Sequence, residues 1–390
     1  MKKVKEIIKK NKFLFYGLLI ILIFFSTTSL FRAIFISYGN SSDIPWTTAK
    51  LFWNHINPYE YFLNGNLNNF ILWGQEPNKF HLFYILITPL AFFEISLINI
   101  FWCFLNIIFL AATMINIKKI FFLNNFDFFL ITSIFLMSTP LRSSISEGQY
   151  SLFIFYFISM YWISENNLVK SINLSLSTIK YSLVPSFFIY CLFKEKKILM
   201  YSFIILIMSV ILFAIQTKSF SLEILFQPIQ VGVKTHTPGL SDFSTVITYF
   251  TGINIFVSLG ICMFFSIILV YHLQKFPKNE IIFSILCLIN LVLLPHTSYD
   301  YIFLLPSLCL FIKVKEITIK DLLYIFPVFF YFFYEKVDVE YVNFFYPNGA
   351  QTTDDELILF QSFGVFILFV SIFVLLMILK DRYEINNKNI

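Results

Sequence analysis

The hydrophobic positions of this chain form long, nearly continuous runs separated by short polar stretches, a pattern typical of a protein that crosses a membrane many times. Six lysines in the first twelve residues precede about 23 mostly apolar residues that begin at Phe13. This run is long for a cleaved signal and lacks a clear A-x-A site, so we expect a retained first span with its lysines in the cytoplasm. Further apolar runs lie near 94–117, 122–139, 149–164, 168–180, 182–193, 198–217, 246–271, 280–295, 301–312, 321–334 and 357–379. The pattern predicts an all-α polytopic membrane protein with about twelve transmembrane helices, within a range of ten to thirteen.

The positions of the basic residues support a topology with both termini in the cytoplasm, because short cytoplasmic loops retain Lys and Arg. Of the 28 basic residues, 20 fall on the predicted inside. They are the six N-terminal lysines, Lys118, Lys119, Lys170, Lys194, Lys196, Lys197, Lys275, Lys278, Lys313, Lys315, Lys320, Lys380, Arg382 and Lys388. The other eight lie outside or at that interface, so each needs an explanation of its own.

Two regions do not fit a simple series of spans. The run Phe80–Phe93 contains Pro89 and is shorter than the roughly 20 residues of a spanning helix, so we expect an interfacial helix on the outer surface. Later in the chain, the two consecutive runs 168–180 and 182–193 are also short, and we expect them to be tilted, broken or re-entrant.

The whole chain, 1–390, is expected to be a single integral membrane domain. Its parts are a cytoplasmic N-terminus (1–12), an outer loop with surface helices (36–93), the remaining spans (94–379) and a cytoplasmic tail (380–390). Besides the outer loop, the predicted outside consists of the long stretches 218–245 and 335–356 and the tight polar turns 140–148 and 295–300. Functional residues are expected on this face.

Composition agrees with this class and excludes several others. The chain is 58% hydrophobic and 13% charged, with a mean hydropathy of +0.77, which is too apolar for one soluble core. The five cysteines lie in apolar runs without metal-ligand spacing. No nucleotide-binding loop, HExxH or GxSxG motif is present, and PHTSYD alone is weak support for a hydrolase. No basic stripe indicates nucleic-acid binding, because topology accounts for the lysine-rich loops.

Polar clusters on the predicted outer face follow one another in a definite order. Asp43 in SYGNSSDIPW is followed by AKLFWNHINPYEY, TPLAFF and LINIFWCFLNIIFL, and then by SEGQYSLFIFYF, STIKYSLVP and PHTSYDYIFLLPSL. From Asp43 to Leu308 this succession resembles glycosyltransferase family 87, the multispanning GT-C enzymes that use polyprenyl-phosphate sugars.

The resemblance implies a GT-C-like fold in the plasma (inner) membrane. It also implies inverting transfer of a sugar, often mannose in that family, from a polyprenyl-phosphate donor to an acceptor hydroxyl on a lipid or glycan outside the cytoplasm. The family places its general base on an acidic residue in the first outer loop, the position that Asp43 occupies here.

The chemistry of Asp43 can also be argued from the residue itself. A lipid-phosphate leaving group needs no proton, so one carboxylate that deprotonates the attacking hydroxyl can suffice. The structural alternative is that Asp43 caps a helix beginning at Ile44-Pro45, a favoured arrangement that does not exclude catalysis.

The donor phosphate needs cations, and Lys180 and Arg142 are the candidates on the outer side. Lys180 precedes Pro185 as in the family, although the spacing is looser than the usual near-adjacent pair. Snorkelling of Lys180 to the interface and pairing of Arg142 with Glu147 are the structural alternatives.

Further candidates surround these residues. His296 would contact phosphate or orient Asp43, unless it is a satisfied turn histidine. Asp300 and Gln149 would bind sugar hydroxyls, with a backbone bend at Gly148. The aromatic residues Trp46 and Tyr59 would form a sugar platform, although aromatic belts at membrane interfaces are common.

Convergence of Asp43, Glu76 and Asp300 on a divalent ion is conceivable, but no spacing demands a metal, and we expect no cofactor. The main alternative function is a secondary transporter or lipid-sugar flippase, for which internal symmetry is expected and not found. A non-catalytic scaffold and an arginine-dependent polysaccharide polymerase or ligase are weaker alternatives.

Overall fold

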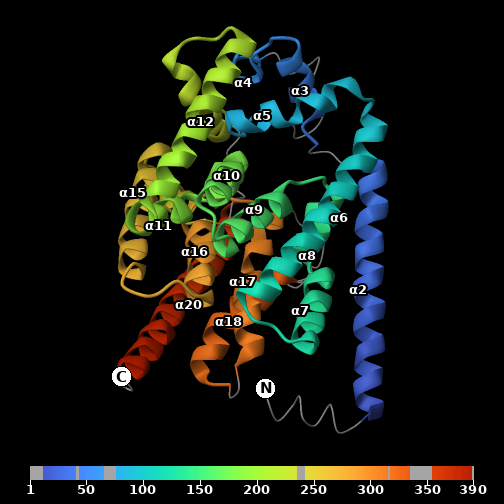
Figure 1. The fold of residues 1–390 in the computed structure, drawn as a ribbon, viewed down its shortest axis with the longest axis vertical. Coiled ribbons are helices and arrows are strands. Elements are labelled where there is room, and N and C mark those ends of the chain that lie inside the picture. The colour runs from blue at the N-terminus through green and yellow to red at the C-terminus, as the bar shows by residue number, and fades with distance from the viewer. Residues whose placement is uncertain are drawn as a thin grey trace. The chain divides into compact units, whose positions relative to one another are not determined.

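The computed structural model of the chain describes residues 12–40, 44–65, 76–234, 242–314, 317–333 and 354–388. Every regular element in these ranges is a helix, as the apolar runs predict (Figure 1). Contacts divide the chain into two compact units: unit 1 comprises 1–32, 117–143 and 238–390, and unit 2 comprises 33–116 and 144–237.

Within the described ranges, five helices are long and apolar enough to cross a membrane. They are α2 (Lys12–Asn40), α6 (Ile95–Ile120), α12 (Lys196–Thr217), α15 (Ile255–Leu273) and α20 (Asp354–Lys388). A sixth span results if α7 (Asn125–Met137) and α8 (Thr139–Ser146), which are bent by 61°, count as one. Many apolar side chains on these helices face away from the protein, for example Phe31 and Phe35, which are each 72% exposed. This much uncovered apolar surface is expected of a membrane-embedded protein.

Unit 2 contains most of the predicted first outer loop and a group of short helices. Its elements around α6 and α12 are α3 (Trp46–Trp53), α4 (Pro58–Leu63), α5 (His81–Ile87), the 3-10 helix η2 (Thr88–Phe92), α9 (Ser151–Ile163), α10 (Asn167–Ser177), η3 (Thr178–Leu183), α11 (Pro185–Lys194), η4 (Leu222–Leu225) and α13 (Gln227–Lys234). Asparagines occupy the N-cap positions of α4 and α10. The side chains of Asn57 and Asn166 each accept hydrogen bonds from two backbone N–H groups of the first turn.

The apolar run Phe80–Phe93 is confirmed as too short to span. It forms the seven residues of α5 and the five of η2, with Pro89 in the first turn of η2. Within unit 2, α5 lies across the direction of α12 and packs against it (Figure 1). Its placement on a membrane surface stays a prediction.

Of the alternatives expected for the runs 168–180 and 182–193, the structure shows a break, with α10 and α11 as separate short helices and a kink in η3 between them. Lys180 has non-helical angles, φ −115° and ψ 89°, inside η3. At the other end of the pair, the Lys170 ammonium lies 2.6 Å from Glu195 Oε1, and the Tyr161 hydroxyl donates to Glu195 Oε2 at 2.7 Å. This ion pair joins the C-terminal end of α9, the start of α10 and the end of α11.

Unit 1 differs in two places from the apolar runs. Besides α7, α15 and α20, it contains α14 (Phe243–Thr251), α16 (Glu280–Leu293), η5 (Ser298–Leu304), α17 (Leu305–Lys313) and α18 (Ile319–Phe332). The expected single span 246–271 is wrong, because Gly252 ends α14 at φ +67° and Asn254 caps α15. Residues 354–356, expected in an outer loop, begin α20 instead.

In unit 1, α20 packs against α16 and α18, and a glycine permits close contact. A Cβ at Gly364 would collide with the Tyr331 hydroxyl. At one end of these helices, Glu280 lies 3.8 Å from Lys313 and 3.7 Å from Arg382. The sequence analysis places Lys313 and Arg382 in the cytoplasm, and this sidedness stays a prediction.

Candidate functional site

The residues predicted to form the site are divided between the two units. Trp46, Tyr59, Gln149 and Lys180 belong to unit 2, and Arg142, His296 and Asp300 belong to unit 1. Asp43 lies outside the described residues. The helix expected to begin at Ile44-Pro45 begins at Trp46, with Pro45 in the N-cap position.

Unit 2 brings Lys180 next to a lysine that the sequence analysis did not single out. The backbone N–H of Phe80 donates to the carbonyl of Ile179 at 3.4 Å. Residues 79 and 180 therefore lie on adjacent stretches of backbone, although they are about a hundred residues apart in sequence. Both lysine side chains are half-buried.

The residue that precedes α9, Tyr150, also lies next to Lys79. The Lys79 ammonium lies 4.6 Å from the centre of the Tyr150 ring, a cation–π contact. Tyr150 follows the buried Gln149, whose N–H donates to the Ser144 carbonyl at 2.9 Å. We call Lys79, Lys180 and Tyr150 the dibasic cluster.

Gly148 has φ +73°, which confirms the expected backbone bend, and its carbonyl accepts a hydrogen bond from Trp102 Nε1 at 2.6 Å. The segments LINIFWCFLNIIFL and SEGQYSLFIFYF, which are separate in the sequence, are therefore in direct contact. The bend directs Gln149 and Tyr150 into the start of α9.

A buried aromatic group fixes the backbone of the dibasic cluster. The Tyr59 hydroxyl donates to the Lys79 carbonyl at 2.6 Å, and its ring packs edge-on against His81 and Tyr84. Tyr59 is fully buried, and this burial raises the pKa of its phenol well above the usual value. The phenol therefore stays protonated and donates, while its role as a sugar platform stays a prediction.

His81 is the titratable group of this core. One ring nitrogen, Nε2, lies 2.9 Å from the Ile224 carbonyl, so Nε2 carries the proton and donates. Burial lowers the pKa of His81 from 6.5 to about 4, which keeps the ring uncharged at neutral pH.

We expect this burial to make unit 2 sensitive to acid. A histidine whose pKa is lower in the folded than in the unfolded state stabilises folding above pH 6.5, and this contribution is lost as the pH falls towards 4. The expected loss is about 2 kcal/mol at pH 5. Melting temperatures measured from pH 7 to pH 5 should fall less for His81→Gln than for the unmodified protein, while His272→Gln, at an exposed position on α15, should behave like the unmodified protein. Identical slopes for all three proteins would contradict this role.

A polar network joins the predicted first outer loop to the end of α12 and the stretch that follows it. Asn57 Nδ2 donates to Gln227 Oε1 at 3.0 Å, and Gln227 Nε2 donates to Glu60 Oε1 at 3.2 Å. His55 Nδ1 also lies 2.8 Å from the Gln216 carbonyl. Two stretches of unit 2 that the sequence predicts to lie outside are therefore fixed to each other by side chains.

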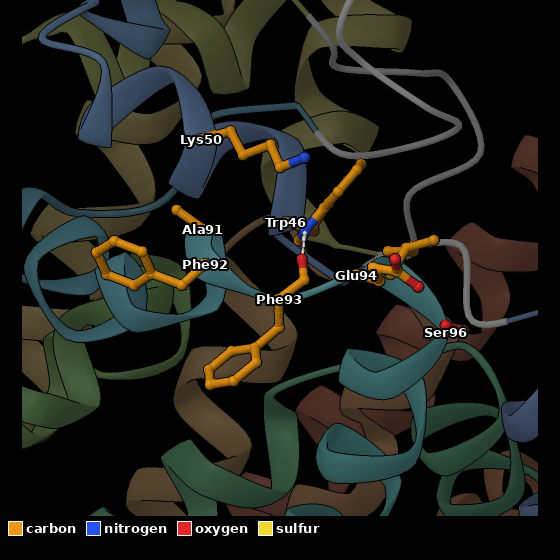
Figure 2. Close-up of a pocket in the computed structure, with 8 residues that line it drawn as sticks. Trp46, Lys50, Ala91, Phe92, Phe93, Glu94 and Ser96 are labelled. Atoms are coloured by element: carbon orange, nitrogen blue, oxygen red, sulfur yellow. Dashed lines mark hydrogen bonds between the residues drawn. The ribbon is translucent and has the colours of Figure 1, made fainter.

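Trp46 lies at a pocket of about 450 Å³, lined by α3 and by residues 91–96 (Figure 2). Its Nε1 donates to the Phe93 carbonyl at 2.9 Å, and the Lys50 ammonium lies 3.7 Å from the centre of its ring. Figure 2 shows the Glu94 carboxylate at the start of α6, apart from the Lys50 ammonium. The pocket combines a fixed aromatic ring with two opposite charges.

The candidates of unit 1 have structural partners. Asp300 is buried, and its carboxylate accepts hydrogen bonds from the N–H and hydroxyl of Thr297, which forms a capping box at η5. His296 Nδ1 lies 3.1 Å from the Leu294 carbonyl, and Arg142 donates to the Thr139 hydroxyl at 3.4 Å. Roles for these three residues in substrate binding stay predictions.

The sequence analysis missed Lys79, Lys50 and Glu94. The two lysines are among the eight basic residues that lie outside the predicted cytoplasmic loops. Their departure from the expected distribution of positive charge could have marked them as functional candidates. No comparable signal marked Glu94, because only folding brings it near α3. Among the described residues, no group of three His, Cys, Asp or Glu side chains is arranged to hold a metal ion.

Comparison of the chain with protein-family models, with curated proteins and with solved structures finds no match.

Proposed function

We propose that this protein is a membrane glycosyltransferase that transfers a sugar from a polyprenyl-phosphate donor to an acceptor hydroxyl on the non-cytoplasmic face. The proposal includes about twelve crossings, a GT-C-like fold and cytoplasmic termini. The dibasic cluster is the observation that carries it, because two lysines on adjacent backbones suit a phosphate that bears charge throughout the reaction.

The position of the cluster supports an outer-face site. Within unit 2, the short helices α9, α10 and α11 have the Lys170–Glu195 pair at one end and the dibasic cluster at the other. The sequence analysis predicts that Lys170 and the lysines on both sides of Glu195, Lys194 and Lys196, lie on the cytoplasmic side. The opposite ends of these helices would then carry Lys79 and Lys180 to the outer leaflet, where the donor lipid phosphate is proposed to lie.

In the proposed reaction, the Asp43 carboxylate accepts the proton of the acceptor hydroxyl. The hydroxyl oxygen forms a bond to the anomeric carbon as the bond from that carbon to the phosphate oxygen breaks. The electron pair of the broken bond stays on the lipid phosphate, whose charge Lys79 and Lys180 compensate. The configuration at the anomeric carbon inverts, and no general acid or metal is required.

A lipid-sugar flippase is the second candidate, because it too would bind a lipid phosphate at the dibasic cluster. The two functions differ in their product. A transferase releases polyprenyl phosphate and a glycosylated acceptor, while a flippase leaves the donor intact.

Lys79→Gln and Lys180→Gln are each expected to weaken binding of farnesyl phosphate, a short-chain probe that carries the phosphate without the sugar. A lost charge-assisted hydrogen bond is expected to raise the dissociation constant about tenfold or more. The affinity is measured by titration of the detergent-purified full chain.

Lys79→Arg should retain binding, because it keeps the charge. Lys218→Gln, at an exposed position after α12 in the same unit, should also bind as the unmodified protein does. Unchanged affinity in both Lys79→Gln and Lys180→Gln would refute the phosphate role.

A further inference from the structure

The pocket at Trp46 holds two opposite charges that do not neutralise each other. Among the described residues, neither Lys50 nor Glu94 takes part in an ion pair, and the Lys50 ammonium lies over the face of the Trp46 ring. Both charges line the same open pocket (Figure 2). A ligand with a separated anion and cation would complement this arrangement better than a ligand with one charge.

The surface next to the pocket is apolar. Phe92 and Phe93 at its rim are 62% and 49% exposed. From the pocket, the exposed side chains of α6 continue as Leu97, Phe101, Phe104 and Ile108, a spacing of three to four residues that keeps them on one helix face. In the proposed topology, a pocket with two charged lining residues at the start of a lipid-facing helix would lie where lipid head groups meet acyl chains.

We propose that this pocket binds phosphatidylethanolamine, with its phosphate at Lys50, its ammonium at Glu94 and its acyl chains along the exposed face of α6. The indole of Trp46, held by its hydrogen bond to the Phe93 carbonyl, forms one wall. Such a lipid stabilises the junction of α3 with the start of α6. The inference does not depend on sugar transfer.

The two charges favour this lipid over its anionic counterparts. Phosphatidylglycerol offers a phosphate to Lys50 but no ammonium to Glu94, and the carboxylate repels its negative charge. An ethanolamine ammonium, in contrast, donates hydrogen bonds to a carboxylate. The geometry therefore predicts selectivity between two lipids that have the same phosphate and the same acyl chains.

The test measures the dissociation constants of short-chain phosphatidylethanolamine and phosphatidylglycerol with the detergent-purified full chain. We expect the unmodified protein to prefer phosphatidylethanolamine about threefold to tenfold. Lys50→Gln should weaken both lipids by a similar factor. Glu94→Gln should weaken only phosphatidylethanolamine, so the preference should disappear.

Two control variants test whether the lipid preference is specific to this pocket. Lys197→Gln and Glu165→Gln remove exposed charges elsewhere in unit 2 and should leave the preference intact. Equal affinities in the unmodified protein, or a preference that survives Glu94→Gln, would overturn the proposal. Competition by soluble phosphoethanolamine as strong as that by the lipid would show that the apolar face does not contribute, and would overturn the lipid as the ligand. Binding of farnesyl phosphate should be unchanged in Lys50→Gln, which separates this pocket from the dibasic cluster.

Discussion

Asp43→Asn is expected to abolish sugar transfer while it leaves binding of the lipid phosphate intact. An amide has the shape of the carboxylate but cannot accept the proton of the attacking hydroxyl, and loss of a general base lowers the rate about 10²–10⁴-fold. The measurement is mass spectrometry of envelope lipids and glycans from cells that lack the gene and carry either the unmodified or the Asp43→Asn copy. The product should return only with the unmodified copy.

Two further measurements assign this effect to chemistry. The Asp43→Asn protein should bind farnesyl phosphate with unchanged affinity and melt at the same temperature as the unmodified protein. Restored product in cells with the Asp43→Asn copy would remove Asp43 as the base. An intact donor and absent product in both sets of cells would favour the flippase alternative over transfer.

Lys170→Met is expected to cause the largest loss of stability among the changes considered. The side chains of Lys170 and Glu195 are 11% and 17% exposed, so without the Lys170 ammonium the Glu195 carboxylate would keep its charge in a nearly buried position. Breaking a buried pair in this way costs about 3–5 kcal/mol. The melting temperature of the detergent-purified protein should fall accordingly.

The double variant Lys170→Met with Glu195→Met separates loss of the pair from loss of packing. Two apolar side chains of similar size often replace a buried ion pair with little loss of stability, so much of the melting temperature should return. Lys197→Met, at an exposed position at the start of α12, should have little effect. A Lys170→Met protein that melts with the unmodified protein would show that this pair does not stabilise the short helices.

The sequence predicted the helices well because local signals determine them. Apolar runs set their positions, and asparagines such as Asn57, Asn166 and Asn279 set their starts. The break between α14 and α15 was missed because the apolar pattern continues through Gly252, where a single positive φ ends the helix. The number of membrane crossings depends on whether several short helices span the bilayer, and their length alone does not decide this.

The candidate site was harder to predict because its contacts are distant in sequence. Lys180 was identified from its place between two short apolar runs, but its neighbour Lys79 is brought there by one backbone hydrogen bond and the buried Tyr59 hydroxyl. Asn57 was identified within a motif, whereas its partner Gln227 is 170 residues away. Such pairings follow from packing, which a single sequence does not specify.

The short helices of unit 2 also have a consequence for the surrounding bilayer. At 1.5 Å per residue, the 10 to 13 residues of α9, α10 and α11 extend about 15–20 Å, against a hydrocarbon core about 30 Å thick. In the proposed topology these three helices cross the bilayer, and a hydrophobic mismatch of this kind would be relieved in part by local thinning of the membrane. A polyprenyl chain reaching Lys79 and Lys180 would then approach through a compressed leaflet, so turnover should depend on the acyl-chain length of the host lipids.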